Sequence, residues 1–186
     1  MESMLQSVLS NVYPGIWDMF ECLSRDRFCS ISKSPNLEVV KLETERPHHK
    51  HNSAVAIEIL SDEIKIILQT SFKDDPTQSF FAQKKGVNVE DLFKEYSNLL
   101  AGGIREQLSL FGVSTSVGLP WSVTKVVHCE DIETKLPMRS SQSLEIKDAG
   151  SSFTTSLCVH YKPELNLSDF QFKKSDESVS KGLELF

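Results

Sequence analysis

One stretch of this sequence, Val89 to Gly112, carries the side chains best suited to chemistry. Glu95 and Asn98 lie three residues apart, so a helix places this acid and this amide side by side on its surface. Asp91 precedes Glu95 by four residues, and twenty-one residues separate Asn98 from Pro120. The Glu–Asn pair alone is most often a solvated helix face, whereas the longer pattern that ends at Pro120 is more specific.

The same stretch is predicted to be an amphipathic helix, because its apolar residues gather on one half of a 3.6-residue wheel. This apolar half consists of Leu92, Phe93, Tyr96, Leu99, Leu100, Ile104, Leu108 and Phe111. The opposite half carries Asp91, Glu95, Asn98, Gly102 and Arg105, with Gly103 beside Gly102. Each glycine costs a helix about 1 kcal/mol relative to alanine. Two glycines on an exposed side indicate that another backbone approaches the helix there.

Other catalytic signatures are absent from the sequence, which has no glycine-rich phosphate loop, no G-x-S-x-G elbow and no H-E-x-x-H motif. His48, His49 and His51 form a cluster, but no Asp or Cys at ligand spacing completes a metal site, so a solvated turn is expected. His128 and His160 each fall within an expected strand, where a packed or surface histidine is far commoner than a catalytic one. No metal or other cofactor is therefore expected in this chain.

The pattern D-x-x-x-E-x-x-N, formed by Asp91, Glu95 and Asn98 and followed by Pro120, resembles the signature of the CheC/CheX/FliY phosphatases. These proteins hydrolyse the phospho-aspartate of the response regulator CheY. The surrounding EYSNLLAGGIREQLSLFG, followed by a short apolar strand and Leu-Pro, also resembles the phosphatase helix of that family. The chain carries one such motif and in this resembles CheX, since CheC-type proteins tend to carry two. The resemblance is strongest over residues 89–121.

The resemblance implies a role for each residue of the motif. Asn98 would enter the active site of a receiver domain and orient the attacking water, because a carboxamide can both accept from water and donate to it. Glu95 would pair with the receiver's invariant lysine, a contact that becomes strong only where water is excluded. Gly102 would let the receiver backbone approach. Asp91 and Arg105 would contact the partner, and for each a plain solvated side chain is the alternative.

The resemblance also implies what the partner supplies. The receiver would bring the phosphoryl group and its Mg²⁺, which explains why this chain shows no metal site of its own. Pro120 is interpreted structurally, as a turn or strand-edge residue that supports the phosphatase helix. By analogy with CheX, a homodimer is expected, with the sheets joined by exchanged strands.

Three functions fit these observations. The first is a phosphatase that hydrolyses the aspartyl phosphate of a receiver domain, in chemotaxis or related two-component signalling. The second is a binding module of the same fold that docks a receiver or a flagellar-motor component without hydrolysis. The third is a ligand-sensing α+β domain whose helix face is merely solvated. Intact Glu95 and Asn98 favour the enzyme, because a pure adaptor has no need of an amide at the centre of the face.

Composition narrows the choice of partner. Twenty-six acidic residues against twenty basic ones give a net charge of −6 without a basic stripe, so binding to nucleic acid is disfavoured. No apolar run is long enough for a membrane span, and the N-terminus lacks the features of a signal peptide. The four cysteines show no C-x-x-C pairing. Reduced thiols in a cytoplasmic protein are therefore expected.

The remaining elements predict an α+β fold, in which an antiparallel sheet is covered on one face by long helices, as in CheC and CheX. Helices are expected over residues 2–12, 14–24 and 76–85. Strands are expected over 28–33, 37–45, 54–60, 64–68, 123–129, 141–147 and 153–161, the third and fourth forming a hairpin. Residues 1–162 are interpreted as one CheX-like domain, and the polar residues 163–186 as a flexible tail.

Overall fold

The computed structural model describes residues 14–32, 37–42, 51–75, 88–124, 127–148 and 151–173. Within these ranges the chain forms two α-helices, α2 (Pro14–Ser32) and α3 (Val89–Leu110). It also forms the strands β1 (Glu38–Leu42), β2 (Ser53–Leu60), β3 (Ile64–Phe72), β4 (Ser116–Val117), β5 (Trp121–Val123), β6 (Met138–Asp148) and β7 (Ser151–Tyr161). Two single-turn 3-10 helices complete the set, η1 (Cys129–Asp131) and η2 (Leu167–Asp169).

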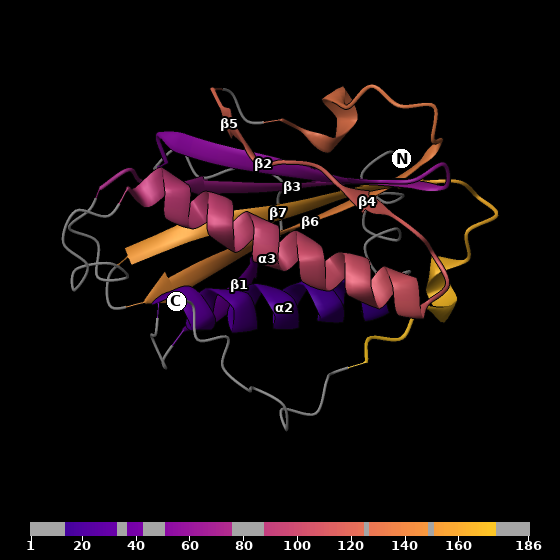
Figure 1. Ribbon diagram of the computed structural model, residues 1–186, viewed down its shortest axis with the longest axis horizontal. Helices are drawn as coiled ribbons and strands as arrows, with labels where there is room; N and C mark the ends of the chain where they lie inside the picture. The colour runs from indigo at the N-terminus through magenta and orange to yellow at the C-terminus, as the bar shows by residue number, and fades with distance from the viewer. Residues whose placement is uncertain are drawn as a thin grey trace, which may run out of the picture.

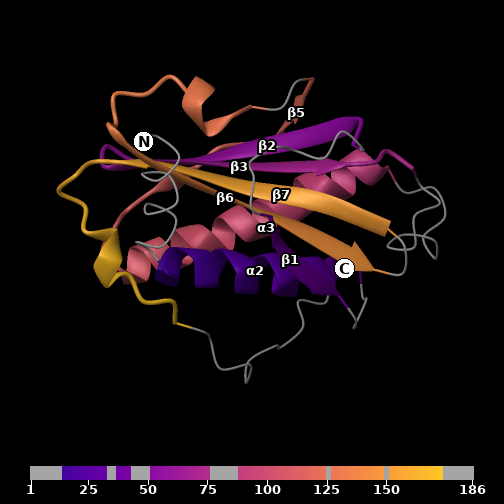
Figure 2. The same ribbon diagram turned by 180° about the vertical axis from the view of Figure 1, so that it is seen from behind.

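The strands form one antiparallel sheet in the order β1-β6-β7-β3-β2-β4, and β5 also pairs with β2. Helices α2 and α3 pack against each other on one face of this sheet (Figure 1). The view from behind shows β2, β3 and β7 in front of α3 (Figure 2). The predicted α+β fold, with helices on one face of an antiparallel sheet, is thus confirmed.

The hairpin that the sequence predicts is formed by β2 and β3, whose pairing runs from Ser53 opposite Phe72 to Leu60 opposite Lys65. Ser61 closes the turn, because its backbone N–H donates to the Ile64 carbonyl at 2.8 Å. Its side-chain oxygen also accepts from the backbone N–H of Ile64 at 3.2 Å. A serine at this position therefore satisfies backbone groups that the tight turn would leave unpaired.

The predicted strand over residues 28–33 is wrong, because α2 continues to Ser32. Phe28 and Ile31 extend the buried side of this helix at three-residue spacing. The Phe28 ring lies in an aromatic cluster beneath α3, with its centroid 4.4 Å from that of Phe153 and 5.5 Å from that of Tyr96. Burial against these rings favours helix over the local strand pattern.

The predicted strand over residues 123–129 is also wrong in its described part. The strand β5 ends at Val123, and Cys129 begins the 3-10 helix η1. The chain there crosses the second face of the sheet, where the Val127 N–H donates to Gln69 Oε1 at 2.8 Å. Cys129 packs with Ile67 and Cys158 in a small buried cluster on that face. The face opposite the helices is therefore partly covered rather than fully wet.

The segment assigned by sequence to the tail is described as far as Lys173, and that part packs on the helices. Phe170 is buried, and its ring lies edge-on to Phe111 at 5.3 Å. Gln107 holds the backbone of Lys173 from both sides, donating to its carbonyl and accepting from its N–H at 3.1 Å each. A Cβ at Gly15 would stand 2.1 Å from the Phe170 carbonyl oxygen, so this close approach requires glycine.

Two predicted helices, over residues 2–12 and 76–85, lie outside the described residues, as do His48 and His49. His51 is described, and its Nε2 lies 3.4 Å from the Thr154 hydroxyl. All four cysteines are thiols.

Candidate functional site

The helix α3 is held firmly in one orientation. Asn88 caps its N-terminus, accepting on its side-chain oxygen the N–H groups of Glu90 and Asp91 at 3.0 and 3.4 Å. Its inward side is buried completely, through Phe93, Tyr96, Leu100, Ala101, Ile104 and Leu108. The Phe93 ring stacks on Phe72 with the centroids 4.1 Å apart. A helix anchored in this way fixes the direction of every side chain on its outer side.

The predicted polar stripe lies on that outer side. Asp91, Glu95, Asn98 and Arg105 are exposed, and Gly102 is half-buried. Because α3 is helical throughout, Glu95 and Asn98 are adjacent on its surface. Both side chains are free to meet a partner, and neither lies in an enclosed site. The sequence had placed all five residues on this side correctly.

The two glycines of α3 have different surroundings. The sequence pattern alone indicates that another backbone approaches the helix at both. A Cβ at Gly102 would meet nothing within 4 Å, so this position is open to an incoming partner. A Cβ at Gly103 would lie 3.3 Å from both δ-carbons of Leu23 in α2. Gly103 therefore allows close packing of the two helices, and only Gly102 belongs to the exposed side.

Leu99 is more exposed than its predicted place on the apolar half of α3 implies. It was assigned to the apolar half, yet 39% of its surface is exposed. The turn of the helix explains the difference, since Leu99 lies at the margin of the apolar half, next to Glu95 on the outer side.

Three side chains join the first turn of α3 to strand β5. Lys94 and Ser122 both contact Glu90 Oε1 at 2.6 Å, and Ser122 donates its hydroxyl hydrogen. The hydrogen bond from Lys94 lowers the pKa of Glu90, and the hydrogen bond from Ser122 lowers it further by a smaller amount. The contact with Glu90 in turn raises the pKa of Lys94. The four-residue spacing of Glu90 and Lys94 could have been read from the sequence. Ser122 could not, because its partner is thirty-two residues away.

Pro120 lies in the link between β4 and β5, both of which pair with β2 beneath α3. The Gly118 N–H donates to the Glu58 carbonyl of β2 at 2.9 Å, which ties the start of the link to the sheet. Figure 1 shows β4 and β5 along the edge of the sheet, next to β2. Pro120 directly precedes β5 and is half-buried, and its role in supporting α3 stays a prediction.

A second group of polar side chains lies on the opposite face of the sheet. Cys129 Sγ is 3.5 Å from His160 Nε2, and both residues are buried. Burial lowers the pKa of His160; a hydrogen bond to the backbone of Cys129 opposes this, whereas Arg139 and Lys65 lower it further. This contact could not be predicted from local sequence patterns, because Cys129 and His160 are thirty-one residues apart.

In the described ranges, no group of three or more His, Cys, Asp or Glu side chains is placed to hold a metal ion. None of the described helices is long and apolar enough to cross a membrane. The exposed side of α3 carries the carboxylates of Asp91 and Glu95, the Asn98 amide and the Arg105 guanidinium, with an open backbone position at Gly102.

No protein-family model and no curated protein matches the sequence. Solved structures do match the fold. A CheC-like superfamily protein from Shewanella sp. PV-4 superposes with a TM-score of 0.59 at 16% identity, over 78% of this chain and 97% of that one. The chain has a CheC-like fold.

Two further structures of this fold are similar to the chain. CheX from Borrelia burgdorferi, in a CheX–CheY–BeF₃–Mg²⁺ complex, has a TM-score of 0.53 at 10% identity, covering 77% of this chain and 96% of that one. The FliM middle domain from Vibrio alginolyticus has a TM-score of 0.54 at 10% identity, covering 83% and 98%. At such identities the likeness establishes the fold and nothing finer.

Proposed function

We propose that this protein is a phosphatase that hydrolyses the phospho-aspartate of a CheY-like receiver domain. The observation that carries the proposal is the exposed pair Glu95 and Asn98, adjacent on an anchored helix of a CheC-like fold. The complex of CheX from Borrelia burgdorferi with CheY supports a receiver as the partner. The lack of an enclosed site around the pair also fits a substrate that is itself a folded protein.

Hydrolysis of an acyl phosphate needs above all a water held in line with the bond that breaks. Asn98 would enter the receiver's active site, accept a hydrogen bond from this water and donate one to a neighbouring acceptor, orienting it without removing its proton. Glu95 would pair with the receiver's lysine and fix the register of the two proteins. The Mg²⁺ and the phosphoryl group belong to the receiver.

The neighbours of the pair would complete the docking surface. Gly102 leaves room for the receiver backbone, since nothing lies within 4 Å of the position of an added Cβ. Asp91 and Arg105, both exposed on the same side of α3, would contact the partner at the two ends of the stripe. Pro120 would hold the β4–β5 link beside the helix.

The test is the loss of phosphate from a phosphorylated receiver domain of the source organism, measured with and without this protein. The wild-type protein should accelerate the loss, and Asn98→Ala should lower the accelerated rate by about 10²-fold, since misplacing a reacting group costs that much. Asn98→Ala should still bind the receiver. If the wild-type protein accelerates the loss and Asn98→Ala does so equally, Asn98 does not orient the water.

A second candidate function is a non-catalytic module that docks a receiver or a flagellar-motor component. The fold similarity to the FliM middle domain favours it. The same experiment separates the two functions. A protein that binds a phosphorylated receiver without changing its rate of phosphate loss is a docking module.

We also propose an oligomeric state and a cellular location for this protein. A CheX-like phosphatase would work in the cytoplasm, where receiver domains are phosphorylated, and would form a homodimer through its sheet edges. Strand β1 is an edge, paired on one side with β6 in the described part of the chain. Light scattering at two protein concentrations should give the mass of a dimer, and a monomer mass at both would exclude it.

A further inference from the structure

Cys129 and His160 form a buried thiol–imidazole contact that the proposed phosphatase does not use. Each residue is 4% exposed, and Cys129 Sγ lies 3.5 Å from His160 Nε2. A thiol within hydrogen-bond reach of an imidazole is the arrangement that activates a cysteine as a nucleophile. Burial lowers the pKa of His160, so its ring is neutral near neutral pH and one of its nitrogens can accept a proton.

Cys158 lies on the same face of the sheet, beside this contact. It precedes His160 by two residues in β7, so both side chains project from one face. Between them is Val159, which pairs with Ser140 of β6. Cys129 Sγ donates to the Ser140 carbonyl at 3.8 Å. The sulfur therefore lies over the sheet between Cys158 and His160. Cys129 and Cys158 also belong to one small buried cluster.

The other two thiols have different surroundings. Cys22 and Cys29 are half-buried on α2, so each is more exposed than Cys129. Cys22 Sγ donates to Asp26 Oδ2 at 3.5 Å. Burial, and after it the Asp26 carboxylate, raises the pKa of Cys29. A nearby carboxylate opposes formation of the thiolate, which is the reactive form of cysteine. These two thiols provide a control within the same chain, because they are more exposed but lie beside a carboxylate.

We propose that Cys129 is a peroxide-sensitive thiol, which His160 activates and Cys158 converts into a disulfide. With the ring proton on Nδ1, His160 Nε2 takes the proton from the Cys129 sulfur, and the thiolate attacks one oxygen of hydrogen peroxide. The S–O bond forms as the O–O bond breaks, and the hydroxide that leaves takes the proton of the imidazolium to give water. Cys129 is oxidised by two electrons to a sulfenic acid, and the peroxide is reduced.

The second step joins the two cysteines. The Cys158 sulfur attacks the sulfur of the sulfenic acid at Cys129, so that the S–S bond forms and the S–O bond breaks. The hydroxide leaves with the thiol proton of Cys158 as a second water. Hydrogen peroxide is the one oxidant that the two steps consume. The disulfide ties η1 to β7, and because a cross-link restricts the unfolded chain, the oxidised protein should be the more stable form.

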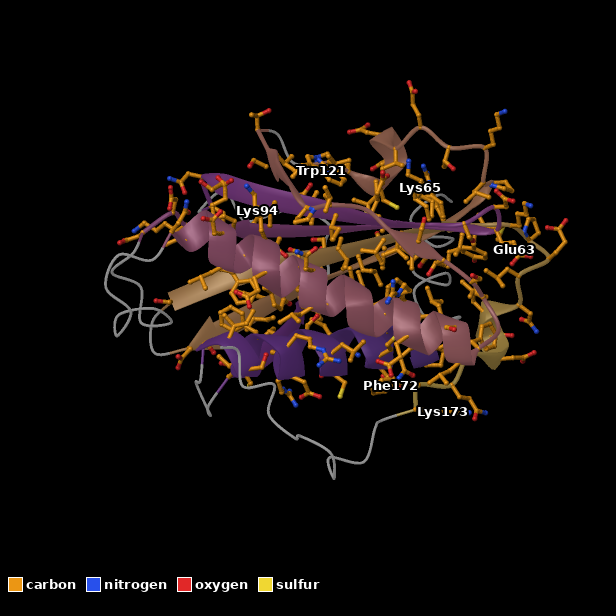
Figure 3. The ribbon with its side chains drawn as sticks, viewed as in Figure 1. Glu63, Lys65, Lys94, Trp121, Phe172 and Lys173 are labelled. Atoms are coloured by element: carbon orange, nitrogen blue, oxygen red, sulfur yellow. The ribbon has the colours of Figure 1, made fainter. Side chains whose placement is uncertain are left out.

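The thiol is buried, so the oxidant must be small. In its described part, the segment that joins β5 to β6 has the single turn η1 as its regular structure. Segments held by few contacts open locally without unfolding of the whole domain. In Figure 3, Lys65 marks this part of the sheet, because it pairs with His160 across β3 and β7. A local opening of this segment admits a molecule close to water in size and excludes a folded protein.

The experiment treats the reduced, full-length protein with a small excess of hydrogen peroxide at neutral pH. Remaining thiols are alkylated, and each cysteine is then mapped by tryptic digestion and mass spectrometry. The four cysteines fall in separate tryptic peptides, which are residues 1–25, 28–33, 126–135 and 148–173. A disulfide between Cys129 and Cys158 joins the last two peptides and lowers the mass of the protein by about 2 Da. Dithiothreitol should restore both thiols.

In the wild type, the thiols of Cys129 and Cys158 should be lost together, at least about tenfold faster than those of Cys22 and Cys29, since a positioned general base contributes at least that much. His160→Gln should slow the loss at both by a similar factor. Cys158→Ser should stop at the sulfenic acid, which dimedone traps as a covalent adduct on Cys129. Circular dichroism establishes that each variant is folded.

Oxidation of Cys22 or Cys29 while Cys129 remains a thiol would overturn the proposal. This outcome needs the wild-type protein alone, so it does not depend on the folding of any variant. A folded His160→Gln variant that oxidises at the wild-type rate would exclude His160 as the base. A folded Cys158→Ser variant that gives no dimedone adduct would exclude the sulfenic acid.

Discussion

The outer side of α3 and the second face of the sheet carry polar groups in opposite settings. Glu95 and Asn98 are exposed, and water competes for both until a partner covers them. Cys129 and His160 contact each other at 3.5 Å and are shut away from water. The pair that resembles an enclosed active site is therefore the one that a macromolecular substrate cannot reach. The pair that looks merely solvated is the one that a partner could complete.

For the contrast between these two faces, the largest expected effect follows from removing the charge of Glu95. Glu95→Gln keeps the size of the side chain but loses the ionic contact with the receiver's lysine. Breaking one side of a buried charged pair costs about 2–5 kcal/mol, so kcat/KM for phosphate loss should fall by at least about 30-fold. The measurement is the rate of phosphate loss against receiver concentration.

The matched control for Glu95→Gln is Cys129→Ser, on the face of the sheet opposite the helices. This substitution preserves the size of a buried side chain that the proposed receiver does not contact. It should leave kcat/KM within twofold of the wild type. A loss of activity from Cys129→Ser comparable to that from Glu95→Gln would mean that the buried contact between Cys129 and His160 takes part in the function.

The same contrast exists within α3, between Gly102 and Gly103. Gly102→Ala should raise the free energy of unfolding by about 1 kcal/mol, because the helix gains propensity and nothing lies within 4 Å of the new methyl group. Gly103→Ala should stabilise less, because Leu23 must move by a few tenths of an ångström to admit it. Urea denaturation of both variants measures the difference. Equal stabilisation would mean that α2 does not constrain Gly103.

Features of the fold and of the candidate site could be predicted from the sequence where they depend on residues close together in the chain. The outer side of α3 was predictable, because the positions of Asp91, Glu95 and Asn98 depend only on helical spacing. The hairpin of β2 and β3 was predictable from alternation and a local turn. Phe28 was misassigned because its place is decided by distant rings, those of Phe93 and Phe153.

The missed contacts are those that the fold alone creates. Ser122 meets Glu90, and Cys129 meets His160, across about thirty residues of sequence. The packing of Phe170 was missed for a different reason. The polar composition of its segment predicts a solvated tail, but the segment is held by the buried side chains of Leu167 and Phe170 and by the hydrogen bonds from Gln107 to Lys173.

A smaller effect concerns the pH dependence of stability. The folded protein lowers the pKa of His160, chiefly through burial, so the unfolded chain binds a proton more readily. Stability from this group is therefore complete above the ordinary pKa of about 6.5 and is lost as the pH falls below it. His160→Gln should flatten the fall in stability between about pH 7 and pH 5, measured by urea denaturation at each pH. An unchanged pH profile would show that another group is responsible.

The smallest expected effect lies at the join between α3 and β5. Ser122→Ala removes the hydroxyl that donates to Glu90 and leaves the contact of Glu90 with Lys94 in place. Because Ser122 is exposed and Glu90 is only half-buried, the loss in free energy of unfolding should be no more than about 1 kcal/mol. The informative readout is the Kd for a receiver domain that carries beryllofluoride and Mg²⁺ in place of its phosphoryl group. A rise in Kd with little loss of stability would show that the Ser122–Glu90 contact holds β5 against the first turn of α3 in the arrangement that the receiver binds, whereas an unchanged Kd would show that pairing with β2 positions β5 by itself.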